Sequence, residues 1–291
     1  MANVDVNGVL IEYAEWGSGP PLLLVMGLGG QLTDWPAEFV DGLAQRFRVV
    51  AFDNRDIGLS SETTGPIMST SAMLRTLLTR RKPESGYVLA DMADDAVGLL
   101  DALDVDSAHV LGISMGGMIA QTMAIHHRQR VKSMVSIMSN TGHRRKGRSS
   151  ASLLVKLARR PKITRDNALE EIVEVAKMIS SPGLDEDELR RLAKASIERS
   201  FRPEGAVRQF TAIAASPDRT DELRTVTAPT LVVHGLLDEL VVPSGGIATA
   251  EAVPGSRLLM FPDMAHDLPR RRWAELVDAV LANAGRAASV S

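Results

Sequence analysis

The chain contains no cysteine, which excludes disulfides, thiolate metal sites and a cysteine nucleophile. It also lacks any apolar run close to the roughly 20 residues of a membrane-spanning helix. The first residues, Met1–Asp5, include neither a basic segment nor an apolar one of the kind that begins a secretory signal. The net charge of −3 gives no reason to expect a nucleic acid or another polyanion as partner. We therefore expect a cytoplasmic globular protein without membrane or nucleic-acid contacts.

Short hydrophobic runs and helical patterns alternate along most of the chain. The runs do not alternate apolar with polar residues, which is typical of strands buried on both faces of a parallel sheet. They are Leu22–Met26, Val49–Phe52, Ala108–Ile113, Met134–Met138, Thr230–Val233 and Arg257–Phe261. Upstream of them, Asn7-Gly8 joins two further strands and predicts a tight hairpin. Helical spacing over residues 87–104 separates two of the runs, so the pattern predicts an α/β fold.

The alternation of strands and helices stops between residues 141 and 222, where the pattern is helical throughout. Two amphipathic stripes, 169–179 and 189–197, are separated by the helix breaker Ser181-Pro182-Gly183. We therefore predict a helical cap over 141–222, inserted between two strands of a core formed by 1–140 and 223–291. A short additional helix is expected at Met73–Leu78.

Residues Gly112-Ile113-Ser114-Met115-Gly116 carry the G-x-S-x-G pattern. An apolar run precedes the pattern and a helical run follows it, which is the strand–turn–helix setting of a nucleophile elbow. Small residues on either side of the serine allow the strand and helix to pack closely. The pattern predicts that Ser114 is a nucleophile whose hydroxyl is exposed to substrate.

A serine nucleophile needs a base and an acid that orients the base. Asp238 follows the strand run that begins at Thr230, and His266 follows the run that ends at Phe261. Both therefore lie just beyond the carboxyl ends of predicted strands, where ligands bind in open α/β sheets. Glu239, next to Asp238, is the alternative acid. Asp267, next to His266, is expected to be a turn or helix-capping residue.

Two backbone N–H groups are expected to stabilise an oxyanion. Met115 N–H directly follows the nucleophile, and the glycine-rich segment Met26-Gly27-Leu28-Gly29-Gly30 offers Leu28 N–H as the second donor. Four residues near the three catalytic positions are candidates for the substrate pocket. These are Met26, Gly27, Trp35 and Met264.

The chain resembles the α/β-hydrolase superfamily over nearly its whole length, and within it the capped serine carboxylesterases related to aclacinomycin methylesterase. The signatures are Met26–Gly30, Asp53–Ser60, Gly112–Gly116, Gly235–Asp238 and His266–Pro269. The resemblance implies a mostly parallel eight-stranded sheet with a helical cap. It also implies cofactor-free ester hydrolysis by Ser114, His266 and Asp238, with Leu28 and Met115 forming the oxyanion hole. Two departures are Met26, where many members have histidine, and Ala265, where glycine is common.

The expected function is hydrolysis of small to medium carboxylic esters through an acyl-enzyme, with no metal and no cofactor. One alternative keeps the same triad but uses hydrogen peroxide, as in cofactor-free haloperoxidases and perhydrolases. Another is a non-catalytic ligand receptor on the hydrolase fold. The expected partner is a small ester, and the sequence carries no signal for an oligomeric state.

Overall fold

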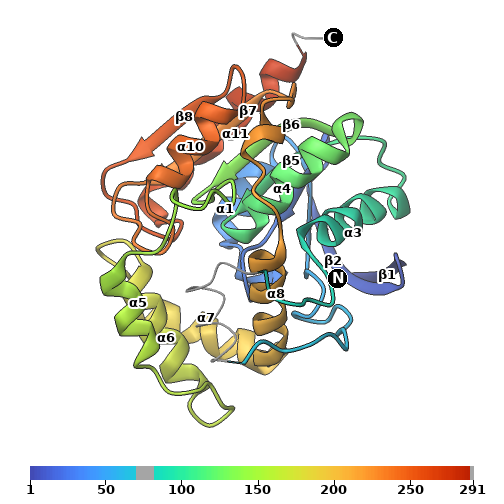
Figure 1. Cartoon of the computed structure of the whole chain (residues 1–291). Coiled ribbons are helices and arrows are strands. Elements are labelled where there is room, and N and C mark those ends of the chain that lie inside the picture. Colours follow the sequence, from blue (N-terminus) through green and yellow to red (C-terminus); the bar gives the residue numbers. More distant parts are fainter. Residues whose placement is uncertain (70–81, 289–291) are drawn as a thin grey trace.

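A computed structural model describes residues 1–69 and 82–288 (Figure 1). The helix expected at Met73–Leu78 lies outside the described residues. The sheet has the order β1-β2-β4-β3-β5-β6-β7-β8, in which β1 and β2 pair antiparallel, β2 and β4 pair antiparallel, and every later pair is parallel. The strands are β1 (Ala2–Val6), β2 (Val9–Trp16), β3 (Pro21–Val25), β4 (Arg48–Phe52), β5 (Ala108–Ile113), β6 (Val131–Ile137), β7 (Thr230–Gly235) and β8 (Arg257–Phe261). The predicted mostly parallel eight-stranded sheet is confirmed.

The hairpin between β1 and β2 turns at Asn7 and Gly8, which have φ angles of 50° and 78°. Positive φ at both central residues is what a type I′ turn requires, and asparagine followed by glycine tolerates it.

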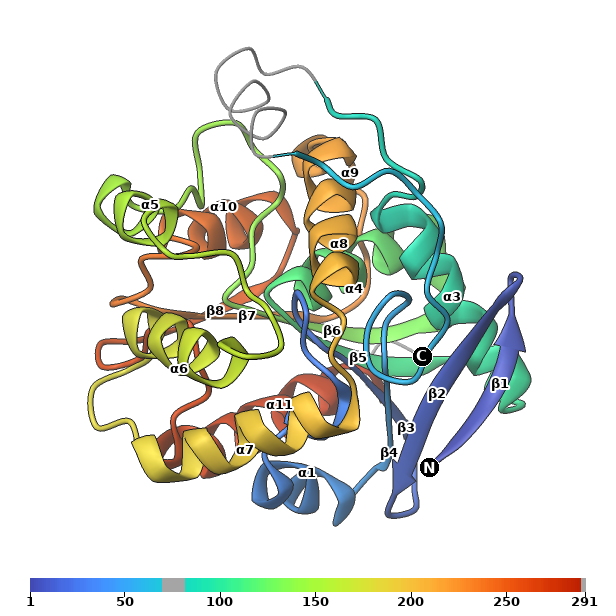
Figure 2. The same ribbon diagram turned by 90° about the horizontal axis from the view of Figure 1, so that it is seen from below.

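Helices cover both faces of the sheet. Helices α3 (Leu89–Ala102), α4 (Met115–His126) and α10 (Ser244–Ala252) lie on one face, and α1 (Ala37–Ala44) and α11 (Trp273–Ala288) lie on the other (Figure 2). Single 3₁₀ turns at Leu32–Asp34, Arg128–Arg130 and Arg270–Arg272 complete the connections.

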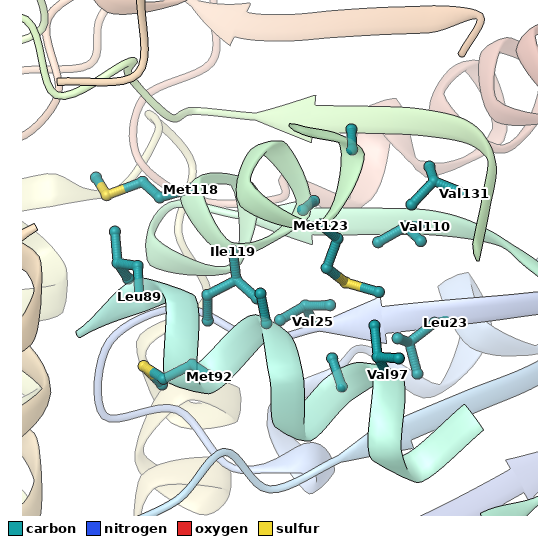
Figure 3. Close-up of a cluster of buried hydrophobic side chains, with 14 of the residues drawn as sticks. Leu23, Val25, Leu89, Met92, Val97, Val110, Met118, Ile119, Met123 and Val131 are labelled. Carbon is teal, nitrogen blue, oxygen red and sulfur yellow. The ribbon is translucent and has the colours of Figure 1, made fainter. Parts of the chain in front are cut away.

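The continuous apolar runs divide their side chains between the two faces. In β3, Leu23 and Val25 join the core under α3 and α4, whereas Leu22 and Leu24 join the core under α1 and α11. Figure 3 shows the first of these clusters, where Val25 lies near Ile119 of α4 and Leu23 lies near Val97 of α3. Burial of one such side chain contributes about 1.5–3 kcal/mol to the free energy of unfolding. A strand with apolar residues on both faces is therefore most stable in a sheet that helices cover on both sides.

Four longer helices lie between β6 and β7 in sequence and beyond one end of the sheet in space (Figure 1). They are α5 (Ala151–Ala158), α6 (Ala168–Ile179), α7 (Glu186–Arg199) and α8 (Pro203–Ala215), and the short α9 (Thr220–Leu223) leads back to the sheet. This helical insertion agrees with the predicted cap, and we keep 141–222 as its proposed extent. No helix among the described residues is long and apolar enough to cross a bilayer.

Buried charges join the cap to the loop that follows β4. Arg199 of α7 lies 2.8 Å from Oδ2 of the fully buried Asp53, and Arg208 of α8 lies 3.0 Å from the equally buried Asp56. Asp53 also accepts hydrogen bonds from Leu32 N–H at 2.7 Å and Leu59 N–H at 2.8 Å. The cap therefore contacts the core through ion pairs that solvent screens little.

Replacing Asp53 by asparagine is expected to destabilise the protein by about 3 kcal/mol, because Arg199, whose side chain is only 14% exposed, then loses its counter-charge. Urea unfolding monitored by circular dichroism measures the difference. The control is Glu188→Gln, which removes an exposed ion pair with Arg191 and should leave the unfolding midpoint almost unchanged. Equal effects of the two substitutions would contradict the role given to Asp53.

Candidate active site

Ser114 occupies the turn between β5 and α4 in a strained backbone conformation. Its φ and ψ angles are 53° and −117°, and its N–H donates to Ile137 O on the neighbouring strand at 2.9 Å. A non-glycine residue at such angles persists only where the surrounding packing holds it. The turn places the serine at the amino end of α4, whose first N–H groups have no partners within the helix.

Two glycines allow the strand and the helix to approach this closely. A Cβ atom at Gly112 would lie 2.0 Å from Gly116 O, and one at Gly116 would lie 2.0 Å from Val25 O. Any side chain at either position would push α4 away from β5 and β3. The spacing of the G-x-S-x-G pattern is therefore a packing requirement at this turn.

Ser114, His266 and Asp238 form a continuous line of hydrogen bonds. His266 Nε2 lies 3.0 Å from Ser114 Oγ, and His266 Nδ1 lies 2.8 Å from Asp238 Oδ2. An ionised carboxylate only accepts hydrogen bonds, so Nδ1 carries the proton and Nε2 faces the serine as an acceptor. The structure thus brings together residues that are separated by as many as 152 positions in the sequence.

Asp238 is 1% exposed, and its environment keeps it charged. Its Oδ1 accepts hydrogen bonds from Leu240 N–H at 2.9 Å and Val241 N–H at 2.8 Å. Burial raises the pKa of Asp238, but hydrogen bonds from His234 and His266 outweigh burial and bring this pKa down to about 2. The carboxylate therefore stays ionised and orients the histidine ring.

The alternative acid, Glu239, points elsewhere. Its carboxylate accepts hydrogen bonds from Ser150 Oγ at 2.9 Å and Ser152 Oγ at 3.1 Å, at the start of α5. The adjacent Asp238 is the carboxylate that contacts His266.

The glycine-rich loop after β3 lies directly against the nucleophile. A Cβ atom at Gly27 would lie 3.3 Å from Ser114 Cβ, and Gly30 N–H closes a turn on Gly27 O at 3.2 Å. Within the described chain, the N–H groups of Leu28 and Met115 have no hydrogen-bond acceptor. The loop thus lies against Ser114, and Leu28 N–H and Met115 N–H stay the predicted oxyanion donors.

Three of the four pocket candidates lie in the core. Met26, Trp35 and Met264 are at most 5% exposed and belong to the cluster under α1 and α11, with Trp35 stacked on Phe39. They support the loops that bear the site, and direct contact with substrate stays a prediction for them, as it does for Gly27. Leu28, by contrast, is 42% exposed and follows Gly27, which lies against Ser114.

The cap also holds the histidine loop, a contact that the sequence did not reveal. His266 N–H donates to Ile179 O at 2.8 Å, Ala265 N–H donates to Ser181 Oγ at 2.8 Å, and Ser181 N–H donates to Asp267 Oδ1 at 3.0 Å. Asp267, expected to cap a local turn, instead bonds to a residue 86 positions away, and burial raises its pKa. The sequence indicated Ser181 only as part of a helix break, but in the structure it makes two of these three hydrogen bonds.

The comparisons with known proteins show the family to which the chain belongs. Residues 20–269 match the family described as the alpha/beta hydrolase fold. The chain belongs to this family. It is 27% identical to rhodomycin D methylesterase DauP of Streptomyces sp. (strain C5), over 96% of this chain and 97% of that protein. The resemblance to the superfamily and to its methylesterases is thereby confirmed.

Solved structures of the same fold cover the whole chain. The enol-lactonase from Burkholderia xenovorans LB400 has a TM-score of 0.74 at 22% identity, covering 97% of this chain and 99% of that one. A thermophilic esterase from Thermogutta terrifontis has a TM-score of 0.72 at 22% identity, covering 99% of both chains. These two structures show the same fold, whereas the family match and the methylesterase relative show that the protein is an α/β hydrolase with esterase homologues.

The low pKa of Asp238 predicts a pH dependence of stability. This carboxyl has a pKa of about 2 when folded and about 3.9 when unfolded, so its contribution is present above pH 4 and is lost as the pH falls towards 2. The difference in unfolding free energy between the wild type and Asp238→Asn should narrow by about 1 kcal/mol between pH 5 and pH 3. Urea unfolding of both proteins at each pH measures this difference. If the difference in unfolding free energy stayed constant or widened between pH 5 and pH 3, the low pKa of Asp238 in the folded protein would be contradicted.

Ser181→Ala is expected to destabilise the protein by about 1–3 kcal/mol, because it leaves Ala265 N–H buried without an acceptor. The matched control is Ser152→Ala, which removes an exposed hydroxyl at the start of α5. Chemical denaturation of the two variants gives the comparison, and a Ser181 variant as stable as the control would refute the proposed attachment of the histidine loop.

Proposed function

We propose that the protein is a serine carboxylesterase that hydrolyses small to medium carboxylic esters. His266 takes the proton from Ser114 as the hydroxyl attacks the ester carbonyl. The carbonyl oxygen becomes an oxyanion that accepts hydrogen bonds from Leu28 N–H and Met115 N–H. His266 then protonates the departing alcohol, which leaves an acyl group on Ser114.

Water completes the reaction by the same route. His266 removes a proton from water as it attacks the acyl-enzyme, and returns the proton to Ser114 Oγ when the acid leaves. Asp238 stabilises the positively charged ring in both halves of the cycle and keeps its Nδ1 protonated. No metal or cofactor enters this scheme.

The observation that carries the proposal is the line from Ser114 Oγ through His266 to Asp238, with separations of 3.0 Å and 2.8 Å. The glycine-rich loop lies against Ser114, and the N–H groups of Leu28 and Met115 have no acceptor among the described residues, so both are open to an oxyanion. The methylesterase relative supports an ester as substrate. The helical cap beyond the sheet supports a limited size for the acyl and alcohol groups.

Ser114→Ala is expected to lower the hydrolysis rate of p-nitrophenyl butyrate by about 10⁴-fold or more, because the nucleophile is lost. Cooperative thermal unfolding should remain, since the substitution removes one oxygen atom. The control is Ser256→Ala. Ser256 immediately precedes β8, whereas His266 follows the other end of that strand. Assays with peroxide and bromide ions test the perhydrolase alternative on the same preparations. Turnover retained by the Ser114 variant would reject the proposal.

A further inference from the structure

Gln209, on the inner side of cap helix α8, binds two loops of the core at once. Its side chain is fully buried; Oε1 accepts a hydrogen bond from Gly29 N–H at 2.9 Å, and Nε2 donates to Arg55 O at 2.9 Å. Both partners are backbone groups, one a donor and the other an acceptor, so they fix which end of the amide faces each loop. One buried side chain thus ties the glycine-rich loop to the loop after β4.

The contact with Gly29 acts on a specific turn. The hydrogen bond from Gly30 N–H to Gly27 O closes a four-residue turn, and Gly29, its third residue, has a φ of +72°. Positive φ at this position is the mark of a type II turn. In the type I form of the same turn, the peptide between Leu28 and Gly29 is rotated by about half a turn, and its N–H points to the opposite side. Gln209 accepts that N–H only in the observed form.

Leu28 N–H belongs to the preceding peptide of the same turn, in the loop that lies against Ser114. The type I and type II forms share the φ angle of Leu28, so Gln209 acts on this N–H by holding the whole turn in one form and one place, and without the hydrogen bond to Gly29 the loop is free to shift. Leu28 itself is 42% exposed, so packing of its own side chain restrains it little. Stabilisation of an oxyanion depends on donors that are held in place before charge develops.

We propose that Gln209 is a positioning residue for the oxyanion hole, acting through Gly29 on Leu28. The inference rests on the proposed esterase function. Under it, the cap does more than shape the pocket, because it holds one of the two oxyanion donors in its working orientation.

The test compares substitutions at Gln209 with a matched control on the same helix. Gln209→Met keeps the length of the side chain but removes both hydrogen bonds, whereas Gln209→Glu keeps an acceptor for Gly29 N–H and loses the donor to Arg55 O. The control is Thr211→Val. Thr211 is equally buried, but its hydroxyl donates to Val207 O of its own helix at 2.8 Å.

Each protein is assayed for kcat and KM with p-nitrophenyl butyrate, and for inhibition by an alkyl trifluoromethyl ketone. Such a ketone adds to the serine and forms a tetrahedral oxyanion, so its affinity reports on the hole and not only on the fold. We expect Gln209→Met to lower kcat by at least about tenfold and to weaken inhibition by a similar factor, with KM little changed. Gln209→Glu should retain more of both, and Thr211→Val should match the wild type.

The proposal is overturned if Gln209→Met keeps kcat and inhibitor affinity within about twofold of the wild type, or if it changes KM alone. Should this variant fail to fold, Gln209→Asn replaces it. The shorter amide stays polar but cannot reach Gly29, and the same losses are expected. If the wild type neither hydrolyses the ester nor binds the ketone, the proposed function itself fails. If it does both and the Gln209 variants behave like the control, only the role of Gln209 is rejected.

Discussion

The site depends on the strained backbone of Ser114. A serine at φ 53° and ψ −117° is disfavoured by about 1–3 kcal/mol, and it is held there because β5 and α4 pack together through Gly112 and Gly116. This turn points the hydroxyl towards the loop that carries His266 and places it at the open amino end of α4. The glycine-rich loop after β3 and the loop that carries His266 have to be positioned relative to this turn.

The cap helps to hold these other parts in place, through contacts with two regions of the core. Through Arg199, Arg208 and Gln209 it contacts the loops after β3 and β4, and through Ser181 it contacts the loop that carries His266. Buried charges contribute little net stability against an apolar alternative, but they specify one arrangement, since a displaced cap would leave each charge unpaired. The loops after β3 and β4 and the loop that carries His266 therefore share the cap as a support, and the geometry of the candidate site depends on core and cap together.

Much of the fold could be predicted because its signals are local. The Asn7-Gly8 hairpin, the apolar strands and the setting of Ser114 each follow from a few neighbouring residues. The attachments of the cap could not be predicted, because Gln209 and Gly29 are 180 residues apart and nothing in the sequence pairs them. Met26 shows a second limit. Its position next to the site suggested a pocket wall, whereas its membership of the core under α1 and α11 follows from the series Leu22 and Leu24, and its contact with substrate stays a prediction.

The most direct test of the account is to map where a fluorophosphonate reacts, by mass spectrometry of the intact protein and of its peptides. An activated serine should form a single adduct on Ser114, and the adduct should be lost on unfolding and in a His266→Gln variant, which cannot accept the proton in the same way. An unlabelled Ser114 in the native protein, or labelling that persists without His266, would contradict a nucleophile activated by the line of hydrogen bonds to Asp238.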